Sequence, residues 1–369
     1  RSNRHSSPVG GGNAPKAGIQ STKKKQKKKL ISGQQRVTCP SWLDYNTPKH
    51  NGFCTNVIIG CIRSLSCART RDKQMSLKRN LLGLIFCSFF VISYFTNKYV
   101  LSVLKFTFPT LFQGWQTFVG GLLLLVSGKL GLVEMTGFPR SAALSWLPGS
   151  LLFIGNIYAG SRALSCLPIP FFFTLHNGSE FVTILALKLM QRERTSWIKL
   201  FSVSLLLVST VSLPLCDPQF NPGGYMWAVV HFSCVGGYRV LQKFTHLSDL
   251  EQQYINYVFS VLLLAFAAHP TGDLFGALEF PFLLSYKFHS GCCASALLGF
   301  FLLLATVKLK SSLPSEHCGA WIFLAKVLAA CLSPFVFDIV VNIPTLFCLL
   351  LSNCGEALLV YSERSGPER

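Results

Sequence analysis

Charged residues are scarce in this chain of 369 residues, of which Asp, Glu, Lys and Arg make up only 13% while apolar residues make up 50%. Soluble domains carry about 25% charged residues, so the composition excludes an ordinary water-soluble protein. Acidic residues are the scarcest charged class, with 15 Asp and Glu against 34 Lys and Arg. The sequence therefore indicates a polytopic protein whose main partner is the lipid bilayer.

Patterns of catalysis and metal binding are also missing. Neither HExxH nor G-x-S-x-G occurs, and no pair of carboxylates at a fixed spacing suggests general acid–base chemistry. None of the 14 cysteines form pairs at the spacing of zinc ligands. Most of the cysteines beyond the N-terminal segment lie in apolar runs, where cysteine behaves as a small hydrophobic residue. We predict that the protein is not an enzyme and that it has no metal and no cofactor.

The positive charge is concentrated in residues 1–74, which hold 15 Lys and Arg but only Asp44 and Asp72 as acidic residues. Residues 23–29 are lysine-rich, and no secretory signal pattern is present. Such a run is compatible with a nucleic-acid patch, with attraction to anionic lipid or with disorder. Met75 is the first methionine and would serve as a true start. We favour a disordered or non-native tail, and we predict no nucleic-acid partner.

About ten apolar stretches are typical of membrane spans, which take roughly 20 residues each. The predicted spans are 81–104, 109–127, 144–164, 169–190, 197–215, 225–241, 254–269, 292–307, 319–337 and 344–361. Lys and Arg are enriched in alternate connections, and this bias places both termini in the cytosol.

The predicted fold class is an all-α polytopic membrane protein with two inverted repeats of five helices. A sequence typical of a turn, Asp217–Gly223, separates the fifth span from the sixth. Because five is odd, the second block runs inverted relative to the first, which is the usual plan of a secondary transporter. The predicted repeats are 75–217 and 218–362, and residues 363–369 form a cytosolic tail.

Lys326 is the most informative residue, because it lies within the apolar run Trp321–Asp338. A cation inside a span costs about 2.5–3.5 kcal/mol on insertion scales, so it normally faces a cavity or a partner. The alternative is that Lys326 lies near a helix end and extends to the headgroups. Glu180 lies in the fourth span, which is equivalent to the ninth under the repeat, so we expect Glu180 to face Lys326 across a central cavity.

Several other polar residues interrupt the predicted spans. Each either contributes to a site or is satisfied by neighbouring helices, and the sequence leaves both alternatives open. These residues are Asn97, Lys98, His176, Asn177, Asn256 and Tyr257.

The chain resembles nucleotide-sugar transporters of the drug/metabolite transporter superfamily over about residues 77–362, and is nearest to the GDP-mannose branch. The resemblance rests on Thr96–Val100 in the first span, on Leu147–Leu164 in the third, and on Ile169-Pro170 and Leu175–Asn177 in the fourth. It implies an antiporter of the Golgi or endoplasmic reticulum membrane that imports a nucleotide sugar and exports a nucleoside monophosphate. A homodimer is left open.

Two substrate motifs depart from that branch. Its FYNN motif corresponds here to Tyr254–Tyr257, and its GALNK motif to Ile322–Lys326. Ala325 and Ile322 make no side-chain hydrogen bond, so a buried guanine would keep unpaired groups that cost about 1–3 kcal/mol each. Uracil can instead stack on Tyr254 or Tyr257.

We therefore predict a UDP-sugar, with UDP-N-acetylglucosamine first, exchanged for UMP. The alternatives are a transporter of GDP-mannose or another metabolite, and a transport-inactive scaffold that retains the fold. The predicted substrate-binding residues are Lys326, Asn256, Tyr257, Tyr254, Ala325, Ile322, Asn97, Lys98, Glu180, His176 and Asn177.

Overall fold

The computed structural model describes residues 53–134, 137, 139–191 and 195–365, and side chains from residue 76 onward. The chain divides into two units, Arg1–Cys67 and Ala68–Arg369. The second unit holds the helices that build the candidate site.

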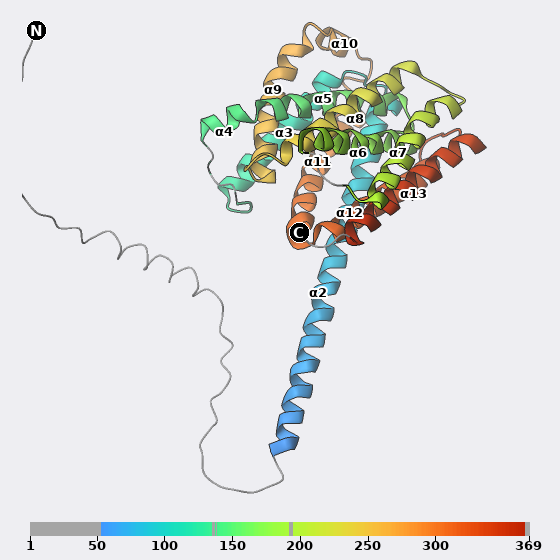
Figure 1. Cartoon of the computed structure of the whole chain (residues 1–369). Coiled ribbons are helices and arrows are strands. Elements are labelled where there is room, and N and C mark those ends of the chain that lie inside the picture. The colour runs from blue at the N-terminus through green and yellow to red at the C-terminus, as the bar shows by residue number, and fades with distance from the viewer. Residues whose placement is uncertain (1–52, 135–136, 138, 192–194, 366–369) are drawn as a thin grey trace, which may run out of the picture. The chain divides into compact units, whose positions relative to one another are not determined.

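Helices make up most of the described chain, and no strand occurs in these residues. In chain order they are α2 (Phe53–Lys98), η1 (Tyr99–Val103), α3 (Pro109–Lys129), α4 (Arg140–Ser145), α5 (Leu147–Cys166), α6 (Ile169–Gln191), α7 (Trp197–Cys216), α8 (Pro222–Gln242), α9 (Asp249–Ala268), α10 (Asp273–Leu278), α11 (Tyr286–Ser312), α12 (Ser315–Leu332), η2 (Ser333–Phe335) and α13 (Ile343–Ser365). Figure 1 shows α7 in yellow-green beside α13 in red, and the two helices are in contact along their length.

Local sequence explains where several helices begin. Pro109 and Pro222 occupy the first positions of α3 and α8, where the missing N–H of proline costs no intrahelical hydrogen bond. Helix α9 begins with a capping box, in which the Ser248 side chain accepts from the Glu251 N–H and the Glu251 carboxylate accepts from the Ser248 N–H. These signals place the helix ends without tertiary contacts.

Among the described residues, six helical segments are long and apolar enough to cross a membrane: Ser76–Val103, Pro109–Lys129, Trp197–Cys216, Tyr286–Ser312, Ser315–Phe335 and Ile343–Ser365. The protein is therefore a helical multi-pass membrane protein. Helices α5, α6, α8 and α9 coincide with other predicted spans but fall outside this set. Polar side chains within them, such as His176 and Asn256, lower their hydropathy.

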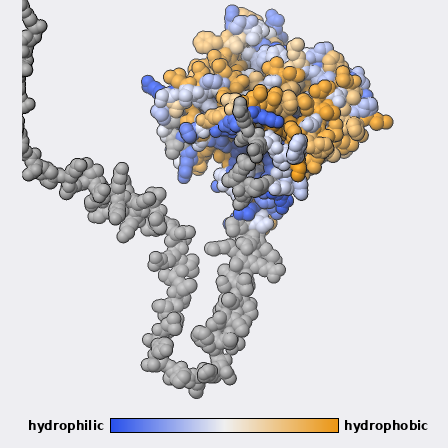
Figure 2. Space-filling model, viewed as in Figure 1, coloured by the Kyte–Doolittle hydropathy of each residue, from blue (hydrophilic) through white to orange (hydrophobic). Residues whose placement is uncertain are grey.

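Large apolar side chains cover the outside of the helical unit. Leu215 and Phe335 are each 86% exposed, and Trp197 is 84% exposed. Figure 2 shows hydrophobic residues in orange over much of the visible face of these helices. Exposure of so many apolar side chains is unfavourable in water but favourable in lipid, in agreement with the membrane assignment.

The disordered or non-native tail at residues 1–74 stays a prediction. Residues 1–52 lie outside the described part of the chain, but residues 53–74 form the beginning of α2. Proline is absent between Pro48 and Pro109, so nothing in this stretch interrupts helical hydrogen bonding. The predicted boundary at residue 75 therefore does not coincide with a helix end.

Helix α6 lies at the centre of the second unit, in contact with α7, α8, α12 and α13. Its first seven residues are all buried. Phe173 of α6 packs against Phe90 and Tyr94 of α2, with ring centroids 5.7 and 4.9 Å apart. The polar residues of α6 are consequently held at fixed positions between these helices.

Candidate functional site

Lys326 of α12 lies within a buried polar cluster contributed by three helices. Its Nζ atom lies 2.6 Å from Oε1 of Glu356 on α13, and it donates a 2.7 Å hydrogen bond to Oδ1 of Asn177 on α6. The Asn177 Nδ2 atom donates to Glu356 Oε2 at 2.9 Å and to Ser352 Oγ at 3.1 Å. The side chains of Lys326 and Glu356 are each 11% exposed. Lys326 therefore does not extend to the membrane surface.

The cluster couples a buried cation to a buried carboxylate of opposite charge. Moving either charge out of water is costly, and the mutual attraction offsets that cost only when the remaining polar atoms are hydrogen-bonded. Asn177 meets this condition, because its carbonyl oxygen accepts from Lys326 and its amide group donates to Glu356. The cluster thus joins α6, α12 and α13 while its charges cancel.

A cavity of about 370 Å³ adjoins this cluster. Apolar side chains such as Phe173, Leu346 and Leu349 form most of its lining, and the polar groups of Lys326 and Asn177 reach it together with Glu356. Ligand sites commonly measure about 300–1,000 Å³ and combine an apolar lining with a few convergent polar groups. The cavity at Lys326 is therefore the candidate binding site.

The predicted pairing of Lys326 with Glu180 is wrong. Glu180 forms an ion pair with Arg239 of α8, while Glu356 occupies the position beside Lys326. Asn177 and Glu180 lie about one turn apart on α6, and at the level of Glu180 the neighbouring cation is Arg239 of α8, whereas Lys326 lies at the level of Asn177. Sequence reasoning missed Glu356, although a carboxylate within the predicted span 344–361 was a sufficient signal.

His176 belongs to a hydrogen-bonded chain that the sequence did not reveal. Its Nδ1 atom lies 3.0 Å from Nε2 of His231, and Nδ1 of His231 lies 3.0 Å from the carbonyl oxygen of Asn156. A carbonyl only accepts, so His231 Nδ1 carries the proton and its Nε2 accepts from His176 Nδ1–H when both rings are neutral. This assignment leaves Nε2 of His176 as a hydrogen-bond acceptor.

Asn256 takes part in a separate network, away from Lys326. Its Oδ1 accepts from Trp146 Nε1 and from Ser150 Oγ, both at 3.0 Å, and its Nδ2 donates to the Tyr238 hydroxyl at 2.8 Å. The side chain is fully buried. These contacts join α5, α8 and α9, and they suffice to explain a polar residue within a predicted span.

The tyrosines of α9 lie against α3. Tyr254 and Tyr257 line a separate, mostly apolar cavity of about 260 Å³ with residues of α3 such as Phe118 and Leu122. Neither tyrosine lines the cavity at Lys326. Ala325 is fully buried and Ile322 packs against the hydrophobic core. The predicted residues of α9 and those of α12 therefore do not share one cavity.

Asn97 and Lys98 both have protein partners. Asn97 Oδ1 accepts from Gln116 Nε2 at 3.1 Å and from the Ser295 hydroxyl. The buried Lys98 donates to carbonyl oxygens at the end of α5, at 2.8 Å from Leu164, 3.4 Å from Ser165 and 2.9 Å from Leu167. The last carbonyls of a helix have no intrahelical donor and attract cations, so Lys98 stabilises the end of α5.

No protein-family model matches the chain. The "UDP-N-acetylglucosamine transporter TMEM241 homolog" of Xenopus laevis is 59% identical over 288 residues, which cover 77% of this chain and 97% of that protein. The chain belongs to the nucleotide-sugar transporter family. The "UDP-N-acetylglucosamine transporter TMEM241" of Mus musculus is 57% identical over 293 residues, covering 79% of this nucleotide-sugar transporter and 99% of the mouse protein.

More distant proteins resemble smaller parts of this nucleotide-sugar transporter. The "GDP-mannose transporter" of Coccidioides immitis is 26% identical over 203 residues, covering 49% of this chain and 52% of that protein. One crystal structure matches with a TM-score of 0.51 and 14% identity, covering 78% of this chain and 98% of the other. At that identity the structural likeness concerns the fold alone. The predicted resemblance to nucleotide-sugar transporters is confirmed.

Proposed function

We propose that this transporter carries UDP-N-acetylglucosamine into the lumen of the Golgi apparatus, or of the endoplasmic reticulum, in exchange for UMP. The observation that carries the proposal is the identity of 57–59% to two proteins whose names specify UDP-N-acetylglucosamine, over 97–99% of their lengths. The GDP-mannose transporters are 26–32% identical over a third to a half of the chain, so GDP-mannose is the second candidate.

Lys326 is the proposed partner of the substrate diphosphate. In the structure Glu356 neutralises it at 2.6 Å, and a bound diphosphate would compete with this carboxylate for the same ammonium group. Release of Glu356 would loosen the connection between α12 and α13. A ligand shifts a conformational equilibrium only through contacts that differ between the two states, and an exchange of partners at Lys326 supplies such a difference.

Two inverted repeats, 75–217 and 218–362, with ten membrane helices are proposed as the architecture. A two-fold axis relates each helix of one repeat to its equivalent in the other, so equivalent helices that lie near the axis contact each other. Contacts between α3 and α9, between α6 and α12, and between α7 and α13 agree with this arrangement, whereas the extensive contacts of α8 with α5 and α6 join helices that are not equivalent. The contact between Asn177 and Lys326 then lies at the interface of the repeats, where secondary transporters bind their substrates.

Exchange in proteoliposomes tests the proposal. Purified protein is reconstituted into vesicles preloaded with UMP or GMP, and uptake of labelled UDP-N-acetylglucosamine, GDP-mannose and a cytidine nucleotide sugar is compared. We expect UDP-N-acetylglucosamine uptake that depends on internal UMP. Exchange of GDP-mannose alone would contradict the substrate, and the absence of any exchange would favour a scaffold.

A further inference from the structure

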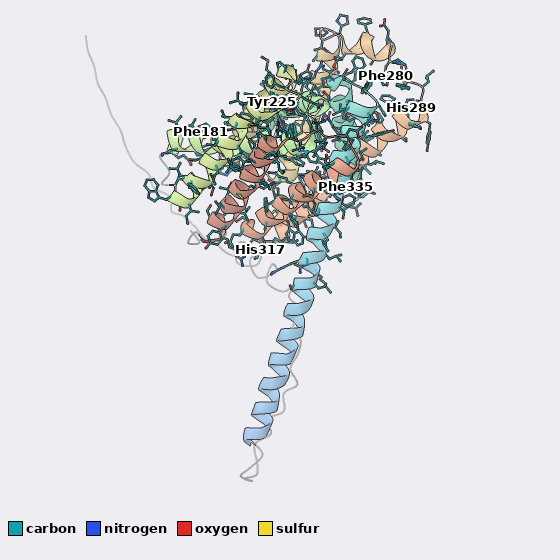
Figure 3. All side chains as sticks on the ribbon, turned by 90° about the vertical axis from the view of Figure 1, so that its right-hand side faces the viewer. Phe181, Tyr225, Phe280, His289, His317 and Phe335 are labelled. Atoms are coloured by element: carbon teal, nitrogen blue, oxygen red, sulfur yellow. The ribbon has the colours of Figure 1, made fainter. Side chains whose placement is uncertain are left out.

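A polar cavity of about 400 Å³, called the basic cavity below, lies between the ends of α6, α7, α8 and α13. Its charged lining residues are Glu180, Lys188, Lys199, Arg239, Lys243 and Glu363. All of these helix ends belong to the side that the cation bias assigns to the cytosol. Figure 3 agrees with the separation of the two sides, since Phe280 and His289 lie at one end of the helical unit and His317 at the opposite end.

The charges in this cavity do not cancel. Glu180 is engaged by Arg239, which leaves one carboxylate, Glu363, facing three lysines. Lys188, Lys199 and Lys243 form none of the ion pairs found in the described part of the chain. The cavity therefore carries an excess of two positive charges, and its walls concentrate this field on a small volume.

The cation bias of cytosolic loops accounts for these residues individually but not for their convergence. Lysines from α6, α7 and α8 reach one hollow of a size suited to a ligand. Other lysines on the same predicted side behave differently: Lys310 pairs with Asp249 at 3.0 Å with both side chains largely exposed, and Lys308 is exposed on α11. Convergence from three helices is the feature that requires an explanation.

The cavity is aligned with the Lys326 site along the same two helices. Asn177 and Glu356 belong to the Lys326 cluster, and Glu180 and Glu363 follow them on α6 and α13. Glu363 follows Glu356 by seven positions on α13, which corresponds to about 10 Å at 1.5 Å per residue. A small hydrophobic cluster borders the basic cavity and consists of Val203, Leu206, Leu359, Phe181 and Ile184, of which Ile184 also lines the cavity.

We infer that this basic cavity binds the phosphate groups of an anion on the cytosolic side. If the anion is the cytosolic nucleotide sugar, the inference rests on the proposed function, and the cavity captures the diphosphate before it reaches Lys326. An anionic lipid headgroup presents the same phosphate chemistry from the membrane. In both cases Lys199 and Lys243 supply point charges, and Arg239 can offer two N–H groups to phosphate oxygens.

Neutralising Lys199 and Lys243 tests the inference. The double variant Lys199→Gln/Lys243→Gln is compared with Lys129→Gln/Lys308→Gln, which removes the same charge from the same predicted side outside the cavity. Both proteins are reconstituted in phosphatidylcholine alone, and uptake is measured against UDP-N-acetylglucosamine concentration. We expect the cavity variant to raise KM about tenfold, a typical effect of electrostatic capture, with little change in kcat. Equal KM values in the two variants would overturn capture of the nucleotide.

A direct binding measurement distinguishes an error in the proposed transport function from an error in the assignment of the cavity as an anion site. Calorimetry with inorganic pyrophosphate needs no transport, and we expect the wild-type protein and Lys199→Arg/Lys243→Arg to bind it more tightly than Lys199→Gln/Lys243→Gln does. The lipid source is tested by adding phosphatidylserine to the vesicles. Thermal stabilisation by phosphatidylserine that disappears in the Gln variant, without pyrophosphate binding, would assign the phosphate to lipid. If neither pyrophosphate nor phosphatidylserine distinguishes the Gln variant from wild type, the cavity is not an anion site.

Discussion

Three variants of the buried ion pair between Lys326 and Glu356 distinguish its contribution to stability from its contribution to transport. Lys326→Met or Glu356→Gln leaves one partner without its counter-charge in a site where each side chain is 11% exposed. Breaking a buried ion pair in this way costs about 3–5 kcal/mol. The double variant Lys326→Met/Glu356→Gln removes both charges, and such replacements are often neutral or stabilising.

The expected pattern differs between the two assays. In thermal unfolding of the purified protein in detergent, each single variant should be clearly less stable than wild type, and the double variant should recover most of the loss. In proteoliposomes neither Lys326→Met nor the double variant should exchange UDP-N-acetylglucosamine, because the diphosphate has lost its cation. Lys326→Arg should restore exchange only in part, because a planar guanidinium does not reproduce a point charge on a flexible stem.

Two controls make this prediction specific. Lys310→Gln/Asp249→Asn removes an ion pair whose side chains are 46% and 40% exposed, and such surface pairs contribute only about 0–1 kcal/mol. Combining Lys326→Met with Glu180→Gln should give additive losses, because Glu180 contacts Arg239 instead. Wild-type exchange by the double variant Lys326→Met/Glu356→Gln would refute the assignment of Lys326 as the phosphate partner.

Three further predictions concern other parts of the molecule. Asn256→Leu should lower thermal stability, because Trp146 Nε1 loses its buried acceptor. The KM of the folded protein for the nucleotide sugar should stay near wild type. A large rise in KM without a loss of stability would show that Asn256 binds substrate. Gly120→Ala places a Cβ 2.9 Å from the Tyr257 ring, so it should destabilise by about 1–3 kcal/mol, and Tyr257→Leu in the same background should relieve this in a melting experiment. A protease-cleavable tag placed after Ser365 should be cut by protease added outside intact microsomes, because the cation bias places the C-terminus in the cytosol. A tag that is cut only after the microsomes are permeabilised would contradict this topology.

The apolar length of segments was sufficient to predict most of the long helices, although it missed the beginning of α2 and the short helices α4 and α10. The span predicted at 109–127 corresponds to α3, Pro109–Lys129, and the span predicted at 344–361 corresponds to α13, Ile343–Ser365. This signal is local, because the apolar length of a segment does not depend on other helices. The same local reasoning identified Lys326 as a cation that required a partner within the membrane.

Tertiary structure decided which residues meet. Whether Lys326 pairs with Glu180 or with Glu356 depends on which turns of α6, α12 and α13 lie at the same level, and the sequence of one helix does not encode that alignment. The same holds for Tyr257, which packs on α3 instead of reaching Lys326, and for the three lysines that converge in the basic cavity. Membrane class and helix limits follow from the transfer of each segment into lipid, whereas partners and cavities follow from packing between segments far apart in the chain.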